Sequence, residues 1–231
     1  MDVKVLDQKD DKVKVLFKGT NTAFVNALRR QIMGGTPVLA IEDVHIYANT
    51  GVMFDEMLAH RLGLIPLKMD SKKQKEGDKV KLVLDKEGPC TVYSKDIKST
   101  DPKIEPVDPS ILITKLADGQ KLKVEMEAVV GRGRQHAKWQ PAIVSYTELP
   151  SIAPKSGKGK SYKADVIEMI LDEKTRDIPI KDDEKLEYDD TTFLFIIESH
   201  GNMSPKELFV SATEELREKA KEFRGELKNL S

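Results

Sequence analysis

The 231-residue sequence predicts an α+β fold, in which strands and helices are grouped instead of alternating along the chain. Three observations predict this class. A strand pair and a helix open the sequence, several short strand-like segments fill its middle, and an apolar strand followed by a long amphipathic helix closes it. Hydrophobic residues make up 39% of the chain, which at this length is enough for a sizeable buried core.

The first 35 residues predict a β-hairpin followed by a helix. Apolar and polar residues alternate over residues 2–17, on both sides of the turn sequence DQKDDK. The helix would be capped by Thr20, Asn21 or Thr22 and would end at the glycine pair GG of residues 34–35. Its predicted apolar stripe consists of residues spaced four apart, with alanines alongside: Phe24, Leu28 and Ile32.

A short helix is predicted over residues 54–63, FDEMLAHRLG. Asp55 can act as its N-cap, and Gly63 can supply the left-handed residue that ends a helix. His60 and Arg61 then fall in the last helical turn, where cations complement the negative end of the helix dipole. Neighbouring helix positions point about 100° apart, so these two side chains do not converge on one atom as a catalytic pair would.

The middle of the chain is predicted to be rich in strands, which are interrupted by the turn sequences KEGP and STDPKIEPVDPS. The strand-like segments are residues 36–47, 64–67 (LIPL), 78–93, 111–114, 121–130 and 143–146. Residues 131–142, GRGRQHAKWQPA, are expected to form a loop. Residues 150–164 are rich in Pro, Gly, Ser and Lys and indicate a linker or surface excursion. Residues 165–190 are charged and weakly patterned, so their structure stays undecided.

The last 41 residues carry clear signals. TTFLFIIES (residues 191–199) is almost wholly apolar and predicts a strand buried on both faces. Ser204, Pro205 and Glu207 provide an N-cap, a first-turn proline and a capping-box partner for a helix. An apolar stripe recurs along this helix every three or four residues: Leu208, Ala212, Leu216, Ala220, Phe223 and Leu227. The stripe must pack on the chain's own sheet or on a partner helix, and composition leaves both alternatives open.

Charge and residue spacing exclude several kinds of site. The chain has 38 basic and 39 acidic residues, a balance that argues against an electrostatic nucleic-acid binder. None of the four histidines stands at a metal-ligand spacing, and Cys90 is the single cysteine, so no internal disulfide is possible and no metal site is predicted. Cys90 is interpreted as a small buried hydrophobe. Glycines 131 and 133 lack the spacing of a phosphate-binding loop. With no signal peptide or long apolar run, a cytoplasmic location and no membrane association are expected.

Four segments together resemble a known family. They are NALRR (residues 26–30), HRLGLIPL (60–67), HAKWQPA (136–142) after Gly131, and FIIESHGNMSPKEL (195–208). The sequence resembles a family of subunits of DNA-directed RNA polymerase. This family includes the archaeal D-type subunit, the eukaryotic third subunit and the N-terminal domain of the bacterial alpha subunit. The segments occur in the family's order and span nearly the whole chain.

This resemblance implies a discontinuous dimerisation domain, an antiparallel sheet with helices built from residues 1–37 and 187–231. It also implies an inserted β-rich domain over residues 38–152. Residues 153–186 would then be a reduced extra segment that lacks a cysteine cluster. Some relatives hold iron–sulfur or zinc clusters, which Cys90 alone cannot build, so no cofactor is expected.

The implied function is that of a non-catalytic assembly platform in DNA-directed RNA polymerase. Subunit L would form an alpha-like heterodimer with the chain. Its other partners would be subunits N and P and the large catalytic subunits. DNA would be contacted only through the whole complex. The residues implied for the subunit L interface are Phe24, Leu28, Ile32, Leu208, Leu216, Phe223 and Leu227. Those implied for joining the large subunits are Arg29, Arg30, His60 and Arg61.

Two other functions fit the sequence less well. One is a free-standing nucleic-acid-binding protein that uses the loop sequence GRGRQHAKW, although the net charge of −1 counts against it. The other is a small cytosolic enzyme that uses His60 or His136, which is disfavoured because no convergent catalytic groups accompany either histidine.

Overall fold

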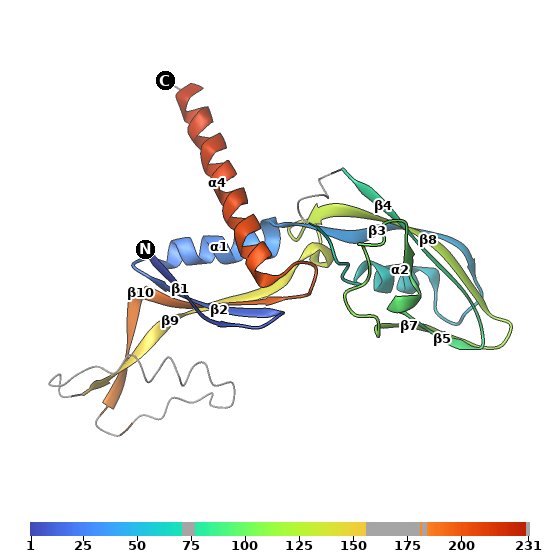
Figure 1. Cartoon of the computed structure of the whole chain (residues 1–231), viewed down its shortest axis with the longest axis horizontal. Coiled ribbons are helices and arrows are strands. Elements are labelled where there is room, and N and C mark those ends of the chain that lie inside the picture. The colour runs from blue at the N-terminus through green and yellow to red at the C-terminus, as the bar shows by residue number, and fades with distance from the viewer. Residues whose placement is uncertain (71–76, 156–180, 182–183, 230–231) are drawn as a thin grey trace. The chain divides into compact units, whose positions relative to one another are not determined.

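The computed structural model describes residues 1–70, 77–155, 181 and 184–229 (Figure 1). It confirms the predicted α+β class with antiparallel sheets. The strands are β1 (Asp2–Gln8), β2 (Lys12–Lys18), β3 (Pro37–Asn49), β4 (Lys79–Glu87), β5 (Cys90–Tyr93), β6 (Lys98–Ser99), β7 (Leu112–Leu116), β8 (Lys121–Arg132), β9 (Ala142–Pro154) and β10 (Glu184–Ser199). The helices are α1 (Thr22–Gly35), α2 (Asp55–Gly63) and α4 (Pro205–Asn229), with short 3-10 turns η1 (Ser94–Asp96) and η2 (Ala137–Trp139). No helix among these described residues is long and apolar enough to cross a membrane.

The chain divides into two compact units. The first contains residues 1–29 and 144–198, and the second contains residues 30–143 and 199–231. These units group residues 199–231 with the middle of the chain. The single dimerisation domain expected from residues 1–37 and 187–231 therefore stays a prediction.

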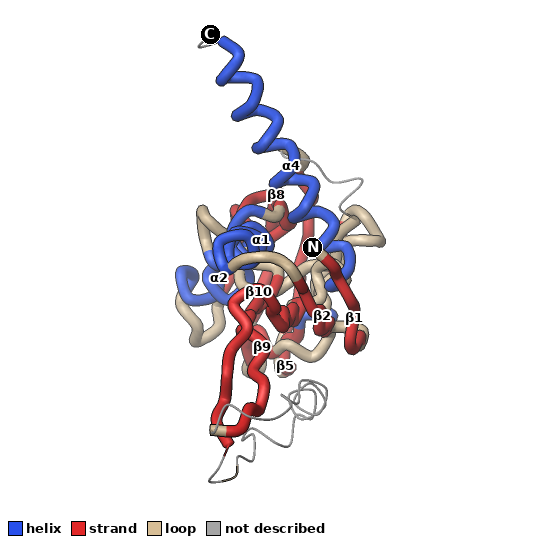
Figure 2. The backbone as a smooth tube through the Cα atoms, turned by 90° about the vertical axis from the view of Figure 1, so that its left-hand side faces the viewer, coloured by secondary structure: helices blue, strands red, loops and turns tan. Residues whose placement is uncertain are grey.

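The first unit is built on a sheet of order β1-β2-β10-β9 (Figures 1 and 2). The predicted hairpin is confirmed as β1 and β2, and β10 pairs antiparallel with β2. Phe17 lies opposite Phe193, and its ring meets Phe195 edge-on at 5.6 Å between centroids. The apolar segment predicted to be buried on both faces forms the second half of β10, where residues 193–195 are all buried.

Helix α1 begins where the sequence predicts but buries a different stripe. Among the three candidate caps it is Asn21 that accepts a hydrogen bond from the Phe24 backbone N–H, at 2.9 Å. Val25, Leu28 and Ile32 are fully buried, whereas Phe24 is exposed. The prediction for Phe24 was therefore wrong by one position, because spacings of three and four residues both fit a helical face.

The second unit contains a sheet of order β3-β8-β4-β6 and a two-stranded sheet of β5 and β7. Apolar side chains from these strands and from α2 form one core, in which Leu39, Leu62 and Met126 are completely buried. Cys90 is half-buried and packs against this core through the start of β5, which places it at the core margin and not in its interior.

The two ends of α2 differ from the prediction. The N-cap position is Phe54, which has no side chain able to cap, and Asp55 is the first helical residue. The Asp55 carboxylate instead accepts a hydrogen bond from the Asn49 side-chain amide at 2.8 Å. Gly63 does not adopt a positive φ, since the helix ends on Leu64 in a right-handed conformation. Both predicted caps were thus wrong, although the helix itself is confirmed.

Residues 64–67 do not form the predicted strand. Only Leu67 makes a β-bridge, an isolated one to Pro106. Pro66 lacks the N–H that a strand ladder needs, and its carbonyl oxygen accepts a hydrogen bond from the Val107 backbone N–H at 2.9 Å. The segment is therefore an irregular connection that begins with a turn at Leu64 and is held at single points.

Strand β9 is longer than predicted, since it runs from Ala142 to Pro154 and includes the beginning of the expected linker. The rest of that linker, residues 156–164, and most of residues 165–190 lie outside the described residues.

Candidate functional site

The apolar stripe of α4 is buried at its start and uncovered towards its end. The predicted capping box is present, because the Ser204 hydroxyl and the Glu207 carboxylate bond each other and each other's backbone. Leu208 and Ala212 are fully buried, and Leu216 is half-buried. Past that point every residue from 217 to 229 is exposed, including Phe223 at 68% and Leu227 at 49%. The last half of α4 therefore carries an amphipathic pattern without a covering element among the described residues.

Polar contacts fix the middle of α4 inside the second unit. The Arg132 guanidinium donates hydrogen bonds to the Gly35 carbonyl oxygen and to the Glu215 carboxylate. The Lys219 ammonium donates to the Gln31 side-chain oxygen at 2.6 Å. Partial desolvation lowers the pKa of the Lys219 ammonium, and the neighbouring charge of Arg134 lowers it further. Since α1 has no basic residue in its own last turn, Arg132 supplies the cation that the helix end favours.

The loop sequence GRGRQHAKW is a packing element of the second unit. The absence of a Cβ at Gly131 admits the Trp139 ring, which would otherwise lie 2.3 Å from that atom. The Trp139 indole N–H donates to the Val129 carbonyl oxygen at 3.2 Å. Lys138 lies 4.5 Å from the Trp139 ring centroid and donates to Ile41 and Glu42. The cations at Arg132 and Lys138 are therefore engaged within the chain and do not form an open basic surface.

The structure separates the residues predicted for the subunit L interface into two groups. Leu28, Ile32 and Leu208 are completely buried within the chain, so a partner cannot reach them without opening the core. Within the chain these residues of α1 and α4 serve its own packing, and their assignment to a partner surface stays a prediction. The residues of the same prediction that remain accessible are Phe24, Leu216, Phe223 and Leu227.

The four residues predicted to join the large subunits are all accessible. Arg29 is half-buried, and its Nε donates to the Asn26 side-chain oxygen at 3.2 Å, while Arg30 is exposed. On α2, His60 and Arg61 are both exposed, and the Arg61 Nη2 donates to the Leu112 carbonyl oxygen at 2.5 Å.

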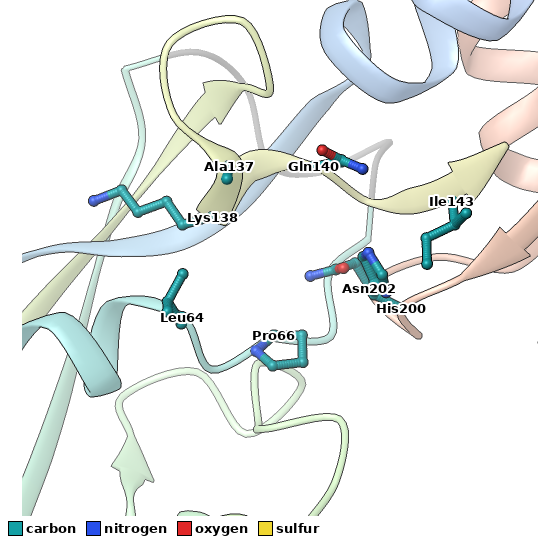
Figure 3. Close-up of a pocket in the computed structure, with 8 residues that line it drawn as sticks. All are labelled: Leu64, Pro66, Ala137, Lys138, Gln140, Ile143, His200 and Asn202. Carbon is teal, nitrogen blue, oxygen red and sulfur yellow. The ribbon is translucent and has the colours of Figure 1, made fainter.

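An open pocket of about 450 Å³ lies beyond the C-terminal end of α2 in the second unit (Figure 3). Its lining residues are Leu64, Pro66, Ala137, Lys138, Gln140, Ile143, His200 and Asn202. Asn202 is buried, and its side-chain amide donates to the Leu67 carbonyl oxygen at 2.8 Å, which fixes one wall. No nucleophile and base meet here, so the geometry suits the reception of an apolar side chain better than catalysis.

Sequence reasoning missed a group of exposed apolar residues before and within α2. Val52, Phe54 and Met57 all have more than half of their surface exposed. Their exposure could not be read from the sequence, because an apolar residue in a loop is as often a core anchor as a surface feature. Across the described ranges, no group of three or more acidic, histidine or cysteine side chains is arranged to hold a metal ion.

Comparisons of the sequence with known proteins give its class, the subunits of DNA-directed RNA polymerase. Residues 44–144 match the family described as RNA polymerase Rpb3/RpoA insert domain. Over the whole chain, the sequence is 36% identical to DNA-directed RNA polymerase subunit Rpo3 of Pyrococcus furiosus, in an alignment covering 100% of this chain and 98% of the relative. It is also 36% identical to subunit Rpo3 of Methanobrevibacter smithii, with 96% of this chain and 97% of the relative covered. The chain belongs to the family of archaeal RNA polymerase subunit Rpo3.

Proposed function

We propose that this polymerase subunit is a non-catalytic assembly platform that pairs with subunit L in an alpha-like heterodimer. The observation that carries the proposal is the stripe of α4, which is anchored in the chain's core at Leu208 and is uncovered after Leu216. The exposed residues 217–229 extend for about 20 Å at the usual rise per residue of a helix. An exposed helix of this length with apolar residues on one face is a typical surface for helix–helix association.

Subunit L would cover Leu216, Phe223 and Leu227, with Phe24 as an accessible residue on α1. Phe223 is the strongest candidate anchor, because exposed aromatic residues contribute most when a partner buries them. The charged residues beside the stripe would lie at the rim of the interface with subunit L, where they remain in contact with water.

The heterodimer would then recruit the large catalytic subunits through Arg29, Arg30, His60 and Arg61. Guanidinium groups suit this role because they bind carboxylates and carbonyl oxygens in a bidentate manner. Subunits N and P would be further partners. In this proposal nucleotidyl transfer takes place on the large subunits in the cytoplasm, and DNA is contacted only through the whole complex.

The heterodimer is tested by co-expression with subunit L and size-exclusion chromatography. The double variant Leu216→Asp with Phe223→Asp places two carboxylates in the proposed apolar seam, where nothing apolar can pair them, and should elute apart from subunit L. Val210→Asp is the matched control, since Val210 is 45% exposed and lies on the opposite side of α4 from the stripe. Co-elution of the double variant with subunit L at micromolar concentration would refute the interface.

The joining step is tested by Arg29→Ala with Arg30→Ala. This double variant should keep its fold and its pairing with subunit L but fail to join the large subunits. Reconstitution of full-size polymerase at the wild-type yield would show that these arginines have no assembly role.

A further inference from the structure

We infer that the loop before α2, the outer face of α2 and the pocket beyond it form one docking surface for a large polymerase subunit. The occupant would present an apolar segment that includes a carboxylate. This inference rests on the proposed assembly function and extends it from His60 and Arg61 to a defined surface, called here the α2 surface: Val52, Phe54, Met57, Arg61, Leu64 and Ile143.

The apolar side chains at the start of the α2 surface are displayed by an ordered loop. The Asn49 side-chain amide donates to the Met53 carbonyl oxygen and to the Asp55 carboxylate, both at 2.8 Å. The Asn49 side-chain oxygen accepts from the Gly51 backbone N–H at 3.2 Å. These bonds hold a tight turn in which Val52 is 85% exposed and Phe54 is 77% exposed. A loop that is already ordered loses less conformational entropy on binding, which favours a role as an anchor.

The same face continues along α2. Phe54, Met57, Arg61 and Leu64 follow one another at spacings of three or four residues, so they lie along one stripe of the helix surface. The adjoining face, about 100° around the helix and formed by Leu58 and Leu62, is buried in the core of the second unit. The exposed stripe is therefore not needed for the chain's own packing, and it extends for about 15 Å at the usual helical rise.

The pocket of Figure 3 extends this stripe past the end of α2. Leu64 forms one wall, and Ile143, which is 55% exposed, lies across the pocket from it (Figure 3). Pro66 and the bonded side chain of Asn202 line the wall between them. A single large apolar side chain of a partner fits such a pocket, and the Phe54 end provides the second contact.

Charge selects the kind of occupant. Arg61 lies within the apolar stripe, and its hydrogen bond to the Leu112 carbonyl oxygen fixes the guanidinium while using one of its five N–H groups. A fixed and exposed guanidinium among apolar residues favours a partner carboxylate. Asp55 and Glu56 stand beside the stripe, and their negative charges disfavour an anionic lipid surface or a nucleic acid. A protein segment with an acidic residue among apolar ones matches this pattern.

The experiment reconstitutes the polymerase from its subunits with each full-length variant. Phe54→Asp with Met57→Asp should weaken the joining of the large subunits at least tenfold, and Arg61→Gln should weaken it several-fold. Tyr188→Asp is the matched control, since Tyr188 is an aromatic residue of similar exposure in the other unit. All of these variants should bind subunit L as the wild type does. Failure of the wild-type chain itself to pair with subunit L would refute the proposed function separately.

Photo-crosslinking identifies the subunit that occupies the α2 surface. It does not depend on the aspartate variants, which could lose binding by misfolding. A benzoylphenylalanine at position 54 keeps an aromatic side chain there, and in assembled polymerase it should crosslink to one large subunit, at a segment that contains an acidic residue. Wild-type joining by the double aspartate variant would overturn the inference. A crosslink from position 54 only to a second copy of this chain, or none to any polymerase subunit, would overturn it as well.

Discussion

Truncation of the uncovered end of α4 separates a partner surface from the chain's own core. The variant is Phe223→Ala with Leu227→Ala, and its counterpart is Leu208→Ala on the same stripe. Phe223 and Leu227 keep 68% and 49% of their surface exposed, whereas Leu208 keeps none. The two variants should therefore fail in opposite assays.

The magnitudes follow from these exposed fractions. Complete burial of a phenylalanine or leucine side chain contributes about 1.5–3 kcal/mol. Covering the exposed parts of Phe223 and Leu227 thus contributes about 2–3.5 kcal/mol together, which corresponds to a rise in the Kd for subunit L of about 30- to 300-fold when both are truncated. The free energy of unfolding of the isolated chain should change by no more than about 0.5 kcal/mol, as for other exposed positions. Leu208→Ala should instead lower it by about 2–5 kcal/mol, because it leaves a cavity in a closed core.

Isothermal titration calorimetry with subunit L measures the first effect, and urea unfolding of the free chain measures the second. The proposed interface is refuted if the Phe223→Ala with Leu227→Ala variant binds subunit L with unchanged affinity. It is equally refuted if this variant unfolds at much lower urea concentration than the wild type, since that would place the stripe in the chain's own core.

Three further predictions test the packing, the charges and the metal content. In urea unfolding, Gly131→Ala should lower the free energy of unfolding by about 1–3 kcal/mol, because the new Cβ displaces the Trp139 ring. Gly225→Ala lies on the exposed part of α4, where a new Cβ meets no atom within 4 Å, and it should raise the free energy of unfolding by about 0.5–1 kcal/mol. The hydrogen bond from the Lys79 ammonium lowers the pKa of the Glu127 carboxyl below 4.5, so its stabilising effect is complete above that value and is lost as the pH falls through the lowered pKa. Glu127→Gln should therefore show a smaller drop in urea midpoint between pH 6 and pH 3 than the wild type, and an equal drop would contradict the pairing. Elemental analysis of the purified chain should find no stoichiometric iron or zinc, and about one metal per chain would contradict the expectation drawn from a single thiol.

Strong local signals predicted the elements with the clearest sequence patterns. The hairpin of residues 2–17 and the apolar strand around Phe193 follow from alternation and from continuous apolar character, and both are confirmed. The capping box at Ser204 and Glu207 needs only residues within one turn, so its prediction was also confirmed.

Signals that depend on tertiary contacts failed. Asp55 is a residue type that favours the N-cap position, but its carboxylate accepts a hydrogen bond from the Asn49 side chain, which lies outside the helix. Phe24 and Val25 fit a helical face equally well by spacing, and only the tertiary packing of the chain decides which is buried. The LIPL segment is apolar enough for a strand, yet Pro66 removes a donor from the ladder.

The candidate surfaces were predictable in part. The stripe on α4 was visible in the sequence, but the point at which its cover ends, after Leu216, depends on how far the rest of the fold reaches. Arg132 and Lys138 belong to the loop that the nucleic-acid-binding alternative would use, and the structure shows that each is engaged with other parts of the chain. The exposure of Val52 and Phe54 comes from a turn held by Asn49, which no spacing rule indicates.

In the proposed heterodimer, this Rpo3-family chain pairs with one copy of subunit L through the uncovered end of α4. Native mass spectrometry of the chain co-purified with subunit L tests it most directly. We expect a single species whose mass is that of one copy of each chain, and we expect its loss in the Leu216→Asp with Phe223→Asp variant. Masses of the free chain or of its own multiples only, or an undiminished heterodimer in that variant, would contradict the claim.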